Sequence, residues 1–169
     1  MKVNIQFEST DADKEITYSN VTAVMEVRPA DYRLTFVEDL SGDGNKTRST
    51  IIITEDSLRL TRSGELNTDF IYGSGMVHNT SYGTPYGTMP VTVTTKEFSC
   101  SVGHMGKTHM VRGTDTNTLW IEPDYYEELT DRMALPDDFE INVEVSYHLA
   151  MGDSEPLNLG MKLKITKVN

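Results

Sequence analysis

Arg62 is the side chain in this sequence whose position most clearly calls for a chemical partner. Period-two alternation places it on the same apolar strand face as Leu58 and Leu60, just before a turn that begins at Ser63. An inward guanidinium requires a carboxylate, a backbone carbonyl or a bound anion, because a buried charge without a partner is costly. We therefore expect Arg62 either to pair with a structural acid or to hold the anionic head group of a ligand.

Other reactive residue types are present, but without the spacing that metal binding or catalysis needs. Cys100, His104 and His109 match no usual zinc pattern, and alternation makes Cys100 a core residue. The serine between Gly73 and Gly75 lacks the glycine spacing of a nucleophile elbow. Phosphate-binding loops and dinucleotide fingerprints are also missing from the sequence. We therefore expect no metal, no cofactor and no enzymatic activity.

Acidic and aromatic residues gather in the segment 118–140. Such a run is most often a solvated surface, yet it could also receive a basic protein partner, with the aromatic rings as anchors. The residues we single out for this role are Trp120, Tyr125, Tyr126, Glu127 and Glu128.

Charge and length narrow the class of protein. The 169 residues include 15 Lys and Arg against 26 Asp and Glu, a net charge of −11, which argues against nucleic acid and anionic membranes as partners. The single cysteine permits no intramolecular disulfide, and no stretch approaches the length of an apolar membrane span. The first residues alternate in polarity, unlike a signal peptide. We expect a cytoplasmic protein that forms one domain over 1–169.

Alternation of polar and apolar residues runs along most of the chain and indicates an all-β protein. The two late strands, 141–151 and 157–165, show it most cleanly. A change of parity predicts a bulge or bend at Ser19-Asn20, because Ile16 and Tyr18 fall out of phase with the apolar residues that follow. A second change predicts one inserted residue near Lys96-Glu97.

Turn residues predict two hairpins. Pairing of Leu34 and Phe36 with Ile53 and Ile51 leaves a four-residue loop at 42–45. An odd-length loop at 63–65, with its glycine in the left-handed region, keeps the next apolar residues on the face of Leu58 and Leu60.

The strands are expected to form a closed or nearly closed antiparallel up-and-down barrel of about eight strands, because closure protects the long sheet edges. A β-sandwich is the alternative architecture. The segment 103–140 breaks the alternation and is interpreted as an excursion or end cap with one short helix at 123–132.

With the strands placed, the chain resembles the YwiB-like family of bacterial proteins of unknown function. The residues that carry the resemblance are Leu60-Thr61-Arg62-Ser63-Gly64, Tyr86-Gly87-Thr88-Met89-Pro90-Val91-Thr92-Val93-Thr94-Thr95-Lys96, Val145-Ser146-Tyr147-His148-Leu149 and Met161-Lys162-Leu163-Lys164-Ile165. The resemblance implies a calycin-like, lipocalin-related β-barrel. It supplies no activity and no catalytic residues.

Two functions follow from these observations. The first is a non-catalytic binding module that holds a small, partly apolar molecule inside the barrel, a site that an anionic head group would suit. We expect its lining to include Arg62, Phe70, Tyr72, Tyr147 and Met161. The alternative is an interaction or scaffold protein with a solid barrel, whose acidic and aromatic 118–140 surface binds a partner protein.

Overall fold

A computed structural model describes residues 1–40, 42–104, 110–112, 135 and 137–168, and it is built of strands. No helix occurs in these residues, and therefore none that is long and apolar enough to cross a membrane. The strands are β1 (Lys2–Thr10), β2 (Ile16–Val27), β3 (Tyr32–Glu38), β4 (Thr47–Ile53), β5 (Ser57–Gly64), β6 (Thr68–Gly73), β7 (Val77–Thr84), β8 (Gly87–His104), β9 (Met110–Arg112), β10 (Phe139–Met151) and β11 (Leu157–Lys167).

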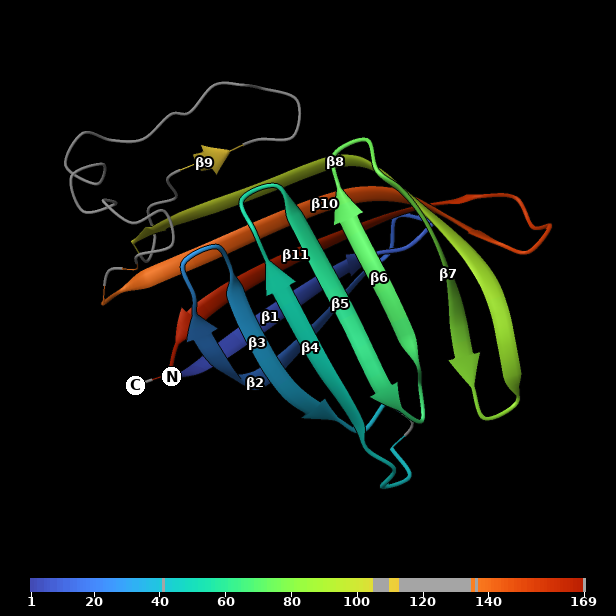
Figure 1. Cartoon of the computed structure of the whole chain (residues 1–169), viewed down its shortest axis with the longest axis horizontal. Helices are drawn as coiled ribbons and strands as arrows, with labels where there is room; N and C mark the ends of the chain where they lie inside the picture. The colour runs from blue at the N-terminus through green and yellow to red at the C-terminus, as the bar shows by residue number, and fades with distance from the viewer. Residues whose placement is uncertain (41, 105–109, 113–134, 136, 169) are drawn as a thin grey trace.

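Most strands that follow one another in the chain are neighbours in the sheet, and every strand pairing is antiparallel. The strand order is β6-β5-β4-β3-β2-β1-β11-β10-β8-β7, with β9 added beside β8. In Figure 1 the short strands β3 to β6 cross in front of the longer β8, β10 and β11. The all-β, up-and-down barrel is thus confirmed, with ten strands along this path where about eight were expected.

The first and last strands close one side of the barrel, and the ends of the chain lie together (Figure 1). β1 pairs with β11 from Val3 opposite Lys167 to Thr10 opposite Gly160. The seam lies between β6 and β7, where an isolated bridge joins Asn67 to Gly83. A ring nitrogen of a β7 residue, His78, also lies 2.9 Å from the backbone oxygen of a β6 residue. The barrel is therefore nearly closed.

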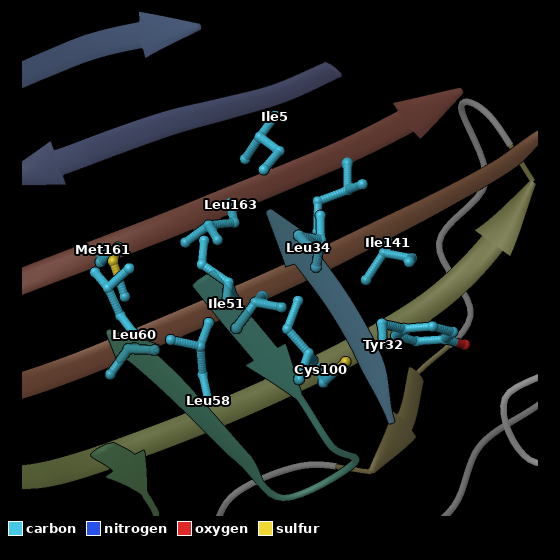
Figure 2. Close-up of a cluster of buried hydrophobic side chains, with 14 of the residues drawn as sticks. Ile5, Tyr32, Leu34, Ile51, Leu58, Leu60, Cys100, Ile141, Met161 and Leu163 are labelled. Carbon is cyan, nitrogen blue, oxygen red and sulfur yellow. The ribbon is translucent and has the colours of Figure 1, made fainter. Parts of the chain in front are cut away.

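The inner faces of the strands meet in one hydrophobic core (Figure 2). Side chains from the short strands β3 to β6 and from the longer β8, β10 and β11 are fully or almost fully buried there. Removal of this apolar surface from water stabilises the barrel. The largest of them include Ile5, Tyr32, Leu34, Ile51, Leu58, Ile141 and Leu163.

A one-residue bulge keeps both halves of β8 facing inward. Ser146 lies opposite Glu97 and Tyr147 lies opposite Thr95, so that Lys96 has no partner on β10. This confirms the insertion expected at Lys96-Glu97. Both Val93 and Cys100, on either side of the bulge, are consequently buried.

The bulge expected at Ser19-Asn20 does not form. β1 and β2 pair without interruption from Lys2 opposite Val24 to Thr10 opposite Ile16. The apolar side chains Ile16 and Tyr18 therefore point out of the barrel, and Tyr18 is 71% exposed. The prediction of a bulge was wrong because it assigned Ile16 and Tyr18 to the core, whereas exposed apolar residues are common.

In both predicted hairpins the expected residues face the core, but the partner of each residue lies two positions away from the one predicted. Leu34 lies opposite Ile51, where Ile53 was expected, because Tyr32 takes Ile53 as its partner. The β3–β4 loop is longer than predicted, and the Asp39 carboxylate accepts hydrogen bonds from the backbone amides of two loop glycines. The β5–β6 turn falls at 65–67, not at 63–65. The Asn67 side chain accepts a hydrogen bond from the backbone N–H of Gly64 and donates one to the backbone carbonyl of Gly64.

Gly64 has no room for a side chain. Its φ is +140°, and an added Cβ would lie 2.5 Å from the carbonyl oxygen of Lys46. Gly64→Ala should therefore lower the free energy of unfolding by about 2 kcal/mol in urea titration. Gly160→Ala is the control, because its nearest contact would be an ordinary 3.5 Å from Thr10. Equal losses in the two variants would contradict the close approach at Gly64.

Candidate functional site

One end of the barrel combines a polar side and an apolar side. It is the end at which β1, β3, β5, β7 and β10 terminate, and we call it the Arg62 mouth. The inner-facing side chains of β3 to β6 supply its polar side, and those of β10 and β11 supply its apolar side.

The polar side is built by adjacent strands whose inner-facing residues lie opposite one another. Glu38 pairs with Thr47 between β3 and β4, and Ser49 pairs with Arg62 between β4 and β5. Arg62 in turn lies opposite Thr68 on β6. The two threonines and Ser49 are buried. Arg62 therefore points inward, as alternation predicts, among hydroxyl groups and one carboxylate.

Arg62 and Glu38 form an ion pair that is too long for a hydrogen bond. The Nε of Arg62 lies 3.8 Å from Oε2 of Glu38. That same carboxylate oxygen accepts a hydrogen bond of 2.9 Å from the hydroxyl of Ser49. The side chains of Arg62 and Glu38 are 22% and 16% exposed, so both groups are partly desolvated. Arg62 thus has a structural acid beside it, one of the two alternatives that the sequence offers, although its Nε makes no hydrogen bond to that acid.

Three buried polar atoms of this mouth have no hydrogen-bond partner in the described part of the chain. They are Nε of Arg62 and Oγ1 of Thr47 and Thr68. Such groups are few in native proteins because each leaves an uncompensated loss of hydration. Here the three lie on the neighbouring strands β4, β5 and β6, on the inner face at the same end of the barrel.

Two tyrosines connect the polar side with the opposite wall. The rings of Tyr72 and Tyr147 lie 4.9 Å apart at an interplanar angle of 63°. Burial raises the pKa of Tyr72 well above its usual range and also raises that of Tyr147, while the Arg62 charge acts in the opposite direction. Both phenols therefore stay protonated at neutral pH and remain neutral hydrogen-bonding groups.

The apolar side becomes more open toward the rim. On β11, Met161 is 8% exposed and Leu157, nearer the rim, is 38% exposed. On β10, Leu149 and Met151 are half-buried and pack against the core. A ligand at this mouth would therefore meet hydrocarbon on one side and hydrogen-bond donors on the other.

The structure brings together the predicted lining residues to different degrees. Phe70 contacts Tyr72 edge to face at 6.4 Å, and Tyr72 contacts Tyr147. Arg62 is close enough to influence the ionisation of both tyrosines. Met161 belongs to the same inner face and is drawn in Figure 2 with the core side chains.

Sequence reasoning missed Glu38, Thr47 and Thr68. Each lies two residues from an assigned or buried inner-facing residue, so continued alternation would have placed them inside. The apolar pattern alone could not show this, because the inner face changes from hydrocarbon to polar groups at this point.

A separate hollow of about 390 Å³ lies on the outer face of β2, β1, β11 and β10. Its polar lining includes Tyr18, Glu8, Glu144 and Lys162. The Lys162 ammonium lies 3.9 Å from both of these carboxylates and is largely exposed. Since its charges are already matched and hydrated, this groove is a weaker candidate than the Arg62 mouth.

Several sequence-based predictions concern residues outside the described part of the chain. These are the helix at 123–132 and the proposed partner-binding residues Trp120, Tyr125, Tyr126, Glu127 and Glu128. Within the described residues, no group of three or more His, Cys, Asp or Glu side chains could hold a metal ion. Burial raises the pKa of the Cys100 thiol to about 12, so Cys100 behaves as a core side chain.

Comparisons with known proteins agree with the fold. A family model described as a domain of unknown function, DUF1934, matches residues 2–111. Among solved structures, the chain is similar to the ywiB protein from Bacillus subtilis, with a TM-score of 0.66 and 13% sequence identity over 99% of this chain and 92% of that one. No curated protein matches the sequence. The predicted YwiB-like resemblance is therefore confirmed, and the structural likeness concerns the fold alone.

Thr68→Val should increase stability. The substitution keeps the shape of a buried side chain and removes a hydroxyl that has no partner within the described ranges, which should raise the free energy of unfolding by about 1 kcal/mol. Thr95→Val is the matched control, because the buried Thr95 hydroxyl accepts a hydrogen bond from the backbone N–H of Gly73 and its loss should destabilise the protein. If both variants lose stability equally in thermal melts, the Thr68 hydroxyl has a partner in the unliganded protein.

Proposed function

The chain belongs to the family of the domain of unknown function DUF1934, and we propose that its barrel is a non-catalytic binding module for a small, partly apolar ligand with an anionic head group. The observation that carries the proposal is the set of three buried polar atoms at the Arg62 mouth that have no hydrogen-bond partner among the described residues. A ligand that accepts their hydrogen bonds would remove a cost that the unliganded protein bears.

The chemistry of the polar side favours an anion as the head group. Arg62 supplies a permanent positive charge, and the hydroxyls of Thr47 and Thr68 supply neutral donors beside it. Hydrogen bonds from a guanidinium to an anion are among the stronger ones in proteins, and partial burial strengthens them further.

The opposite wall favours an apolar remainder of the ligand. Leu149, Met151 and Leu159 are half-buried along the inner faces of β10 and β11. Covering these side chains would remove apolar surface from water, the usual source of affinity in concave small-molecule sites.

A pair of fluorescent probes with one skeleton tests this proposal. 1-Anilinonaphthalene-8-sulfonate carries a sulfonate, and N-phenyl-1-naphthylamine has the same rings without it. We expect both to bind the folded protein, and we expect Arg62→Met to weaken the sulfonate about tenfold or more while it changes the neutral probe little. Arg59→Met, on the outer face of the same strand, is the control and should change neither affinity.

Thermal melting of Arg62→Met separates a binding role from a purely structural one. Glu38 keeps its hydrogen bond from Ser49 in this variant, so we expect it to melt close to the wild type. A loss of several kcal/mol, together with unchanged affinity for the sulfonate probe, would mean that Arg62 serves only to neutralise Glu38.

A further inference from the structure

We propose that Glu38 is a built-in competitor for the head group of the ligand, so that the Arg62 mouth selects apolar molecules with a single negative charge. This inference rests on the proposed function and adds the charge class of the ligand and the residue that sets it. It follows from the position of one carboxylate among the donors of the site.

Glu38 is close enough to Arg62 to compensate its charge, yet does not use its Nε donor. The separation of 3.8 Å leaves the Nε–H without a hydrogen bond, while the carboxylate oxygen is held by the Ser49 hydroxyl. A head group that takes the Nε–H therefore does not have to break a hydrogen bond between the two residues. It must, however, lie close to the carboxylate of Glu38.

The charge balance of the mouth limits what can enter. The inner-facing charges on its polar side are one guanidinium and one carboxylate, both mostly shielded from water. The loop that follows β3 adds Asp39 and Lys46, whose charged atoms lie 3.9 Å apart, and the exposed Asp43, while the β5–β6 turn adds Glu65. A single negative charge is matched by Arg62, the one inner-facing cation of the described polar side. A dianion doubles both the attraction to Arg62 and the repulsion from Glu38, but its cost of losing hydration rises about as the square of its charge, and its second charge has no cation to pair with in a protein of net charge −11.

Two substitutions should consequently change affinity in opposite directions. Arg62→Met removes the attraction and weakens anionic ligands. Glu38→Gln removes the repulsion, and its amide oxygen can still accept the hydrogen bond from Ser49. A residue that only supports the fold would not produce a gain of affinity that depends on the charge of the ligand.

The experiment is displacement of N-phenyl-1-naphthylamine at pH 8.5 by three molecules with the same chain: 1-octanol, octane-1-sulfonate and octyl phosphate, which carry no, one and two negative charges. The wild type should bind the sulfonate more tightly than the phosphate. Relative to the wild type, the Glu38→Gln variant should bind the sulfonate about fivefold more tightly, and its gain in affinity for the phosphate should be larger still. Its affinity for octanol should be unchanged. Glu26→Gln, which makes the same change of charge at an exposed position, should leave all three affinities unchanged.

The outcomes separate this inference from the proposed function. If Arg62→Met weakens the sulfonate but Glu38→Gln strengthens neither anion, the binding site stands and the competitor role is wrong. If neither the neutral probe nor any octyl compound binds the wild type, both proposals are wrong. Should Glu38→Gln fail to fold, the wild type still decides, because equal or tighter binding of the phosphate than of the sulfonate overturns the charge selection.

Discussion

Strict alternation of side chains along a strand is the constraint on which this barrel depends. A shift of one residue would exchange the inner and outer faces of a whole strand, and the core would be lost. The bulge at Lys96, in the pairing of β8 with β10, allows β8 to bury apolar residues on both sides of it. The same alternation leaves Tyr18 outside on β2 and brings Arg62 inside on β5.

The polar character of the Arg62 mouth is a consequence of that alternation. Strands β3 to β6 continue past the apolar core, and their next inner-facing positions are Glu38, Thr47, Arg62 and Thr68. These groups are partly or fully removed from water, and three of their polar atoms lack hydrogen bonds in the described part of the chain. Natural proteins often keep such local costs where they bind another molecule, since function and stability make different demands.

Much of the architecture could be predicted from the sequence, because the inner faces of most strands are continuous apolar sets. The inward position of Arg62 and the burial of Cys100 follow from their phase with neighbouring apolar residues. Strand β7 was missed because its inner-facing residues, His78 and Thr80 among them, carry no apolar pattern. The partners of Arg62 were missed for the same reason, and the hairpin registers depend on side-chain hydrogen bonds of Asp39 and Asn67 that alternation does not encode.

We propose that the Nε–H of Arg62, which has no acceptor in the part of the chain that the structure describes, donates to an anionic ligand, and NMR of the arginine Nε–H groups tests this most directly. On titration of ¹⁵N-labelled protein with octane-1-sulfonate, the Arg62 signal should shift downfield and exchange more slowly with water. The Arg59 signal, from a side chain already bonded to Asp69, should stay in place. An unchanged Arg62 signal at saturating sulfonate would contradict the account.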